Sequence, residues 1–503
     1  MAESNGTVNG NGTHKAHGAN PSKDQNTDPS YIVPLHLPGS HSTPGPTTFP
    51  VISPKTSTTI WHSASASVPH ANAAISSAST AFPSWRASSP QTRRSIFLKA
   101  AHIMQTRSSE LESYMIEETG AEPSFAAFNT TTSIAFLEDV AGRLLSILTT
   151  TSPICQDPTR RALILKEPFG VTLGIAPWNA PYILGIRAAL SALAGGNTVV
   201  LKGSELSPRC FWAIGSIFRE AGLPDGVLSV IYTRPEEAAA VTNALIAHAA
   251  VRKVSFTGST AIGRVIAEQC GRELKPCLLE LGGKAPAIVC ADADLEVAGR
   301  EVVLGALLHS GQICMSTERV LVQEGVVEEF KKVVREKVEQ MFGGVEGMVL
   351  VGSKGVEKNR SLVKDALGKG ARYVIGALEE EKGEVTRMKP IILDGVGEEM
   401  EIYRTESFGP TLSILTYQDE VEAVKIANDS EYGLNSAVFT RDLAKAIRLA
   451  GQIEAGAVHI NSMSVHDEPN LPHGGVKKSG WGRFNTDKGI EEFLVTKTVT
   501  WKE

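Results

Sequence analysis

Cysteine is scarce in this sequence, with six residues among 503. Six are too few for a disulfide framework in a chain of this length, and no two of them form a C-x-x-C pair, which argues against a structural zinc site. We therefore expect reduced thiols, no bound metal and a reducing compartment.

Long basic runs and long apolar runs are missing as well. The formal net charge is -6 and no dense lysine and arginine cluster occurs, so neither nucleic acid nor an anionic membrane is expected as a partner. No stretch is apolar and long enough to span a bilayer, and the N-terminus lacks the apolar segment of a signal peptide. The expectation is a soluble cytoplasmic protein.

What remains is the composition of a globular protein, with 42% hydrophobic and 21% charged residues. A chain of 503 residues is too long for one core, so two or three domains are expected. Residues 1–28 are rich in Asn, Gly, Ser and Thr. They offer too little apolar surface to fold, and we expect a disordered tail.

Strands and helices alternate through the middle of the chain. The predicted strands are 170–176, 198–202, 227–232 and 253–256, and the predicted helices between them are 181–194 and 207–222. This alternation indicates an α/β protein with a parallel, doubly wound sheet. A second alternating region begins near Leu281. Two segments precede these alternating regions. Residues 31–82 are rich in Pro, Ser and Thr, which predicts short strands and turns, and residues 89–148 have patterns that predict helices.

Two segments stand outside this alternation, residues 161–168 and 492–501. Each has the apolar or alternating pattern of a strand. Because lone exposed strands aggregate unless they are paired or covered, we expect these two to be paired, within or between subunits.

Cys314 is a candidate nucleophile. Most single cysteines are structural, and that alternative stays open for this one. The preceding Gly311 allows a close backbone turn, however, and a cysteine placed there can use its own backbone N–H to stabilise an oxyanion.

Glu280 is flanked by leucines and followed by Gly282 and Gly283. A carboxylate in such apolar surroundings is either a satisfied core group or a general base with a raised pKa, and the residues alone leave both interpretations open. The paired glycines suggest a backbone that another group approaches closely.

Asn179 lies just after the predicted strand 170–176, between Pro177 and Pro181. Ligands bind at the carboxyl ends of strands in open α/β sheets, and the prolines hold the amide still. It is therefore a candidate oxyanion donor, with a loop-stabilising asparagine as the alternative.

Three further groups follow predicted strands or turns. Lys202 and Glu205 are either a surface pair or a ribose site at a strand end. Gly258 and Ser259 precede a helix predicted to start near Ala261, where backbone amides attract phosphate. The usual G-x-G-x-x-G fingerprint is absent. Glu406 lies in a turn that is uninformative alone.

Together these strings resemble the aldehyde dehydrogenase superfamily over nearly the whole chain after about Tyr31. The motifs that carry the resemblance occur in the family's order and spacing: PWNAP, VVLKGSE, SFTGST, LELGGK, GQICMSTER, ESFGP and GGVKKSGWGR. The resemblance implies that Cys314 is the nucleophile, Glu280 the general base and Asn179 the side-chain oxyanion donor. It implies cofactor contacts from Trp178, Lys202, Glu205, Gly258, Ser259, Glu406 and Phe408.

The same resemblance implies the domain plan. A Rossmann-like NAD(P)-binding domain would span 29–150 and 170–280, and an α/β catalytic domain 281–485. Residues 151–169 and 486–503 would form a small β oligomerisation arm, so a homodimer or homotetramer is expected. NAD is the expected cofactor because Glu205 would repel a 2′-phosphate, although Lys202 lies nearby and leaves NADP possible.

Within the superfamily, the chain is most similar to aldehyde dehydrogenases of the salicylaldehyde, vanillin and benzaldehyde type. Ala180 stands where many aliphatic-aldehyde relatives carry Phe, which leaves room for a substrate ring. Arg187 is two helical turns after Asn179 and either contacts a phenolic oxygen or forms a structural ion pair. Phe125 either lines the ring pocket or is ordinary helix core.

Two departures from the family pattern lie near the expected substrate entrance. His473 stands where Phe is usual, and Phe484 where many relatives have Glu. The expected reaction is oxidation of an aldehyde through a thioester on Cys314. An aliphatic or semialdehyde substrate is the first alternative. Two further alternatives are a CoA-acylating enzyme and a non-catalytic protein. Glu280 argues against the first, which needs no base for water, and the presence of Cys314, Glu280 and Asn179 together argues against the second.

Overall fold

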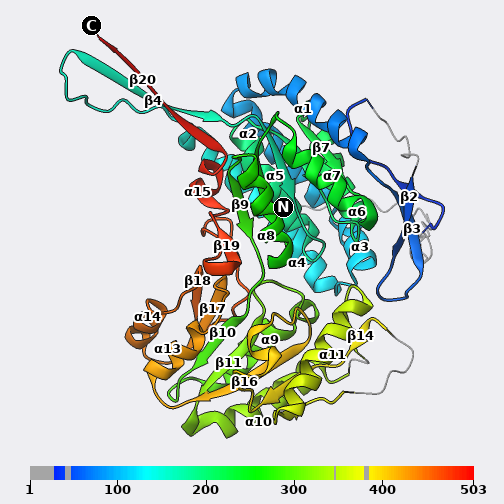
Figure 1. The fold of residues 1–503 in the computed structure, drawn as a ribbon, viewed down its shortest axis with the longest axis vertical. Coiled ribbons are helices and arrows are strands. Elements are labelled where there is room, and N and C mark those ends of the chain that lie inside the picture. Colours follow the sequence, from blue (N-terminus) through cyan, green and yellow to red (C-terminus); the bar gives the residue numbers. More distant parts are fainter. Residues whose placement is uncertain (1–27, 40–46, 345–346, 379–384, 503) are drawn as a thin grey trace, which may run out of the picture.

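The computed structural model describes residues 28–39, 47–344, 347–378 and 385–502. The predicted tail, residues 1–28, lies outside this range except for Asp28. Two α/β units lie one above the other, and a narrow two-stranded ribbon leaves the upper one (Figure 1).

The first sheet has six strands in the order β19-β9-β8-β5-β6-β7. Its members are β5 (Val171–Ile175), β6 (Thr198–Lys202), β7 (Leu228–Ile231), β8 (Val251–Thr257), β9 (Cys277–Glu280) and β19 (Gly480–Trp481). All pairs are parallel except β19 with β9. Parallel strands are covered on both faces, which explains why every residue of β5, β6 and β7 is buried. The predicted doubly wound sheet is confirmed.

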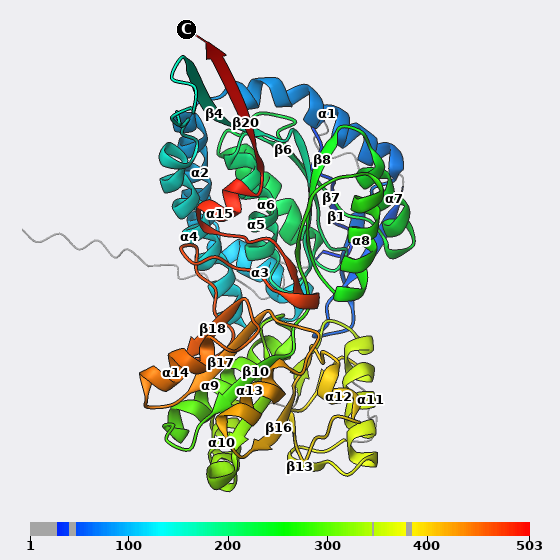
Figure 2. The ribbon, with the colours of Figure 1, turned by 60° about the vertical axis from the view of Figure 1, so that its left-hand side comes forward.

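Helices cover both faces of this sheet (Figure 2). They are α1 (Val68–Ala87), α2 (Pro90–Thr106), α3 (Ser108–Thr119), α4 (Pro123–Ile147), α5 (Pro181–Ala194), α6 (Pro208–Glu220), α7 (Pro235–Ala247) and α8 (Thr260–Arg272). Every residue of α5 is buried, because the helix packs against the strands of the sheet and against α4 and α6. This buried helix fixes the segment that carries Asn179 and Ala180 at its start.

Residues 31–82 only partly follow the expectation of strands and turns. Three short strands form a small sheet: β1 (Ile32–Val33), β2 (Thr48–Ile52) and β3 (Thr59–Ala64). From Val68 onward the chain is helical instead. The buried residues of α1 include Ala71, Ala74, Ile75 and Ala78, an i, i+3, i+4, i+7 stripe. The stripe is made mostly of small alanines among serines, so the composition hides it.

The second sheet has seven strands in the order β13-β15-β16-β11-β10-β17-β18. They are β10 (Ala285–Val289), β11 (Thr317–Gln323), β13 (Arg372–Ile375), β15 (Ile391–Asp394), β16 (Thr411–Tyr417), β17 (Asn435–Phe439) and β18 (Ala457–Ile460). All neighbours are parallel except β13 with β15. The flanking helices are α9 (Leu295–Leu307), α10 (Val327–Phe342), α11 (Ser353–Gly368), α12 (Glu401–Arg404), α13 (Glu420–Asn428) and α14 (Leu443–Ala450). A two-stranded pair, β12 (Met348–Val349) and β14 (Arg387–Met388), completes this unit.

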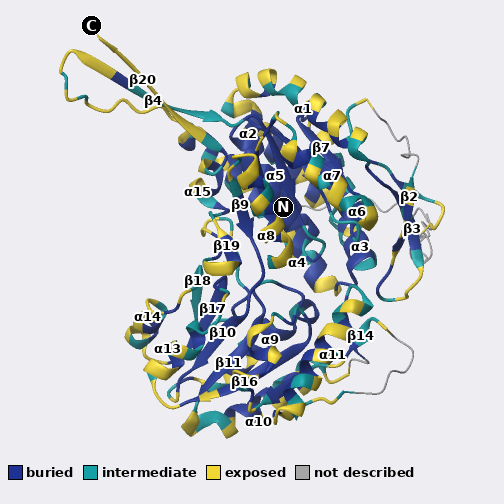
Figure 3. Cartoon of the chain, viewed as in Figure 1, coloured by how far each residue is buried: buried dark blue, intermediate teal, exposed yellow. Residues whose placement is uncertain are grey.

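The ribbon consists of β4 (Arg160–Pro168) and β20 (Leu494–Lys502), paired antiparallel along their full length. It extends away from the body (Figure 1) and is largely exposed (Figure 3). The two segments that stood apart in the sequence therefore pair with each other.

The C-terminal boundary differs from the expected one. β19, expected within the 281–485 segment, belongs to the first sheet because it pairs with β9. α15 (Thr486–Glu491), expected in the arm, packs against α4 and α5. These contacts are between segments far apart in sequence, which local patterns do not reveal.

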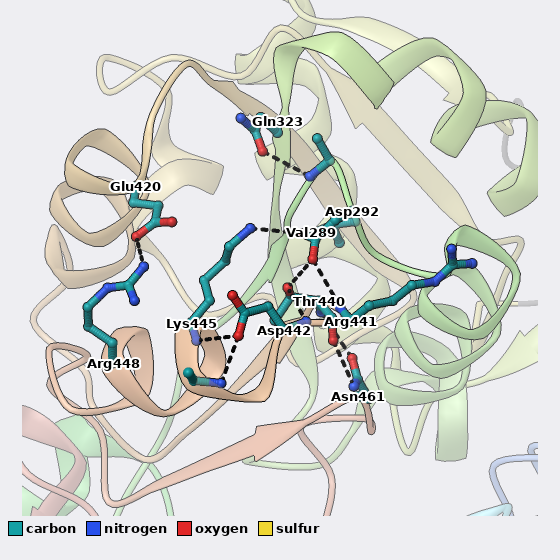
Figure 4. Close-up of polar contacts among 12 residues, drawn as sticks. Val289, Asp292, Gln323, Glu420, Thr440, Arg441, Asp442, Lys445, Arg448 and Asn461 are labelled. Atoms are coloured by element: carbon teal, nitrogen blue, oxygen red, sulfur yellow. Dashed lines mark hydrogen bonds and ion pairs between the residues drawn. The ribbon is translucent and has the colours of Figure 1, made fainter.

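A cluster of charged and polar residues holds the carboxyl edge of the second sheet (Figure 4). Asp292, just after β10, accepts hydrogen bonds from Thr440 Oγ1 at 2.7 Å and Lys445 Nζ at 2.9 Å. Asp442 caps the start of α14. The amino edge of this sheet faces the other way, toward the first unit, because β10 follows β9 after only four residues. Among the described residues, no helix is long and apolar enough to cross a membrane.

Candidate active site

The two sheets face each other through opposite edges. Glu280 is the last residue of β9 and Thr257 the last of β8, so both lie at the carboxyl edge of the first sheet, which Asn179 reaches just after β5. Cys314 comes three residues before β11 and therefore lies at the amino edge of the second sheet. The short link from β9 to β10 brings these edges together.

Cys314 and Glu280 are in direct contact. The thiol Sγ lies 3.0 Å from Glu280 Oε1, and the Glu280 side chain is fully buried. Burial, reinforced by the Glu280 charge, raises the pKa of Cys314 well above its usual value. In the described arrangement the thiol is therefore the donor and the carboxylate the acceptor.

The pKa of Glu280 is lowered, so the raised pKa that the sequence left as one of two interpretations does not apply. Burial tends to raise it, as the apolar flanking residues suggested. His473, Arg187 and the Cys314 thiol together outweigh burial, because each favours the ionised carboxylate. All three come from segments that the local sequence around Glu280 does not reveal.

Close backbone contacts explain the glycines near both residues. A Cβ on Gly311, whose φ is +72°, would overlap the carbonyl oxygen of Gly409. A Cβ on Gly283 would overlap the carbonyl oxygen of Cys314, and one on Gly282 would lie 2.7 Å from a carboxylate oxygen of Glu406. The close approach predicted from the paired glycines is thus present.

Asn179 is tied to the loop that carries the cysteine. Its side chain is 4% exposed, and Nδ2 donates to the Gln312 carbonyl at 2.9 Å. Gln312 in turn accepts from the backbone N–H of Val351 and donates to the carbonyls of His309 and Val349. The Asn179 amide is therefore fixed to the backbone of Gln312, which lies two residues before Cys314.

The predicted cofactor residues lie side by side on neighbouring strands. Lys202 and Phe256 both pair with Ile175 of the central strand β5. Gly258 follows β8 and Ser259 is the N-cap of α8, as predicted, with its hydroxyl accepting from Ile262 N. A strand-end lysine beside exposed amides of a helix N-terminus suits a nucleotide phosphate and ribose.

Glu406 comes from the second unit and meets the first at the glycine link. Its Oε1 accepts from Gly283 N at 2.9 Å. Burial and the nearby charge of Glu318 raise the pKa of Glu406 to about 7. Phe408, which has a φ of +50°, lies edge-on to Trp178 with ring centroids 6.1 Å apart.

Glu318 is a structural partner that the sequence analysis did not single out. Both of its carboxylate oxygens accept from Ser407 N at 2.9 Å, and Oε1 also accepts from Phe408 N at 3.2 Å. It also pairs with the buried Lys284. It holds the 406–408 turn in place. Its position four residues after Cys314, within GQICMSTER, was the available signal.

The predicted substrate-pocket residues lie around the same loop. Phe125 is 4% exposed and stacks on His309, with centroids 4.5 Å apart. The ring centroids of Trp178 and His309 are 6.1 Å apart. Ala180 is the N-cap of α5 and directly follows Asn179. The aromatic groups thus gather beside the segment that leads to Cys314.

Arg187 forms the ion pair that the sequence left as one of two alternatives. Its Nη2 pairs with Asp467, and its Nη1 lies 3.6 Å from Glu280 Oε2. Its guanidinium also faces the rings of Phe136 and Phe484 at 5.1 and 5.6 Å. Nε has no hydrogen-bond partner among the described residues.

Within the described residues, no group of three or more His, Cys, Asp or Glu side chains is arranged to hold a metal ion.

Comparisons with known proteins agree with this arrangement. The model of the aldehyde dehydrogenase family matches residues 41–499. A vanillin dehydrogenase of Pseudomonas sp. is 44% identical over 93% of this chain and 98% of its own length. A salicylaldehyde dehydrogenase of Pseudomonas putida is 40% identical over 90% of this chain and 94% of its own. The crystal structure of a salicylaldehyde dehydrogenase from Pseudomonas putida G7, complexed with salicylaldehyde, superimposes with a TM-score of 0.90 at 37% identity, covering 94% of this chain and 98% of that one.

Proposed function

The chain belongs to the aldehyde dehydrogenase family, and we propose that it oxidises an aromatic aldehyde to the carboxylic acid through a thioester on Cys314. The observation that carries the chemical proposal is the contact between the Cys314 thiol and the Glu280 carboxylate, 3.0 Å apart in a buried site. A nucleophile and a base within hydrogen-bond reach are the arrangement that covalent catalysis requires.

Each side chain has a defined task in this mechanism. Glu280 is the nearest base to take the thiol proton as the Cys314 sulfur attacks the aldehyde carbon. The Asn179 amide and the Cys314 backbone N–H stabilise the resulting oxyanion. When bound, the nicotinamide accepts the hydride that leaves this carbon. After releasing the thiol proton to solvent, Glu280 takes a proton from the water that adds to the thioester. The acid then leaves from Cys314, and the thiolate takes this proton back from Glu280.

Enzymes of this family use NAD(P), and the residues present fit such a cofactor. Lys202 is the last residue of β6 and Glu205 follows that strand, whereas Ser259 caps α8 after β8, which pairs with the other side of β5. Within this set we propose NAD as the preferred cofactor. Glu205 offers its carboxylate to two ribose hydroxyls and repels a 2′-phosphate. A lower KM for NADP than for NAD would overturn this preference.

Three observations support an aromatic substrate. Relatives with 40–44% identity are named for salicylaldehyde and vanillin. Ala180 leaves space beside Asn179, and the stacked Phe125 and His309 offer an aromatic surface near the cysteine loop. The Nε of Arg187, unpaired among the described residues, is a donor for a ring hydroxyl.

The substrate proposal is tested by kcat/KM values for salicylaldehyde, vanillin, benzaldehyde and hexanal. We expect higher kcat/KM values for the aromatic aldehydes than for hexanal. Ala180→Phe should lower kcat/KM selectively for the aromatic aldehydes, and Ala180→Ser, which adds little volume, is the control. A tenfold preference of the wild type for hexanal, about 1.4 kcal/mol in transition-state binding, would end the aromatic proposal. Adding CoA distinguishes an acylating enzyme, because its rate would depend on CoA.

We propose further that the ribbon joins subunits in a homodimer or homotetramer. Val495, Val499 and Trp501 lie at alternate positions on one face of β20 and are 36%, 39% and 43% exposed. Apolar side chains on an exposed strand favour association. Val499→Lys should shift the mass measured by light scattering toward the monomer, whereas Thr498→Lys, on the opposite face, should not. Equal masses for the wild type and both variants would contradict this role.

A further inference from the structure

The two oxygens of the Glu280 carboxylate face different partners. Oε1 faces the Cys314 thiol at 3.0 Å. Oε2 faces three potential donors instead: Thr257 Oγ1 at 3.5 Å, Arg187 Nη1 at 3.6 Å and His473 Nε2 at 3.8 Å. The carboxylate is thus held from one side and reaches the reaction centre from the other.

His473 differs from Arg187 because its Nε2 has no other partner. Arg187 is already paired with Asp467 through Nη2. His473 Nε2 is buried and has no hydrogen-bond partner among the described residues, although it points at Oε2. Leaving a buried donor unpaired is unfavourable, and a movement of under about 1 Å would bring it into hydrogen-bond range.

The backbone holds this imidazole in place. His473 N donates to the Phe484 carbonyl at 3.1 Å, and Phe484 N donates to the His473 carbonyl at 2.7 Å. Phe484 is itself 1% exposed, with its ring against the Arg187 guanidinium. The two positions where this chain departs from its family's usual Phe and Glu are therefore bonded to each other beside the base.

The charges around His473 keep it neutral. Burial and the nearby Arg187 and Arg483 lower the pKa of His473, and only Glu280 opposes them. A neutral imidazole carries one N–H, which it can direct to Oε2. The groups facing Glu280 are then Arg187 from α5, Thr257 from β8, Cys314 from the loop before β11, and His473.

We propose that His473 is a positioning residue for Glu280: its Nε2–H holds Oε2, so that Oε1 stays directed at Cys314 and at the water that hydrolyses the thioester. This role rests on the proposed function, in which Glu280 is the base. It predicts that His473 affects hydrolysis of the thioester more than its formation.

The test compares His473→Phe, His473→Gln and His466→Gln in the full-length enzyme. Phe restores the residue usual in the family but removes the donor, whereas Gln keeps an N–H of similar reach. His466, on the same loop, pairs with Glu468 and is the matched control. For each variant, the NADH burst and the steady-state kcat are measured from pH 5 to 9, with the melting temperature as a check on folding.

Without His473 the pKa of Glu280 rises, because burial then acts with less opposition. In His473→Phe we expect a burst of about one NADH per site and an acid limb of kcat at least about one pH unit higher than in the wild type, equal to about tenfold in rate on that limb. His473→Gln should return the limb toward the wild-type position. A Phe profile that superimposes on the wild type, a Gln variant identical to Phe, or equal loss of burst and steady-state rate would overturn the role. Absence of NADH formation in the wild type would instead overturn the proposed function and this role with it.

Discussion

The raised pKa of Glu406 predicts that cofactor affinity depends on pH near neutrality. With a pKa of about 7, this carboxyl is about one-tenth ionised at pH 6 and about nine-tenths at pH 8. If only the ionised form accepts hydrogen bonds from both hydroxyls of the nicotinamide ribose, the Kd for NAD should fall about tenfold from pH 6 to pH 8.

The direction follows from the environment of Glu406. Burial, together with the charge of Glu318, disfavours the ionised form, and the Gly283 N–H opposes them only in part. A pKa raised on folding contributes stability that is complete below about 4.5 and is lost as the pH rises through about 7. As the pH rises from about 4.5 through about 7, the melting temperature of the cofactor-free wild type should therefore fall more than that of Glu406→Gln.

Quenching of tryptophan fluorescence measures NAD binding directly, since Trp178 lies against Phe408 of the same turn. Binding is titrated at pH 6, 7 and 8 for the wild type and Glu406→Gln. The variant should bind more weakly at pH 8 and show little dependence on pH. A Kd for the wild type that is constant over this range, or a variant with the same pH dependence, would refute the reasoning.

Three other outcomes are expected. Cys314→Ala should lose dehydrogenase activity but keep NAD binding within a few-fold, because its cofactor contacts lie elsewhere; retained turnover would end its assignment as nucleophile. Asp467→Asn should destabilise the fold by about 3–5 kcal/mol, since it removes the closer of the two carboxylates that pair with the buried Arg187 guanidinium. Glu468→Gln, in an exposed pair, should cost about 1 kcal/mol or less in the same thermal unfolding experiment, and equal shifts would contradict this. Removing residues 1–28 should leave activity and Tm unchanged, and a large loss of either would show that this segment docks on the body.

Local sequence patterns predicted the central βα units closely. The apolar run 198–202 and the segment 181–194 match β6 and α5 at both ends, because each is bounded by strong signals: Pro181 at a helix start and a Gly-Gly-Asn turn before the strand. α1 was missed because its buried stripe is built from alanines in a serine-rich segment. β19 was assigned to the wrong unit because strand pairing over long sequence distances leaves no local trace.

At the site, too, some features could be predicted from the sequence and others depend on contacts between distant segments. The resemblance predicted Cys314 and Glu280. They are 34 positions apart in the sequence, and their contact follows from the two sheet edges that the short link between β9 and β10 brings together. The direction of the Glu280 pKa could not be derived from its leucine neighbours, since the decisive donors, His473 and Arg187, come from distant segments. Glu318 was overlooked because its partners, the Lys284 side chain and the backbone amides of Ser407 and Phe408, come from segments distant in the sequence.

The most direct test of the mechanism uses Glu280→Gln. After mixing with NAD and an aromatic aldehyde, this variant should release up to one NADH per site, more slowly than the wild type because the thiol proton has lost its nearest acceptor, and then stall, because hydrolysis of the thioester needs the base. Mass spectrometry of the quenched protein should find the acyl group on the peptide that contains Cys314. Steady turnover near the wild-type rate at neutral pH, or a burst without an acyl group on Cys314, would contradict the account.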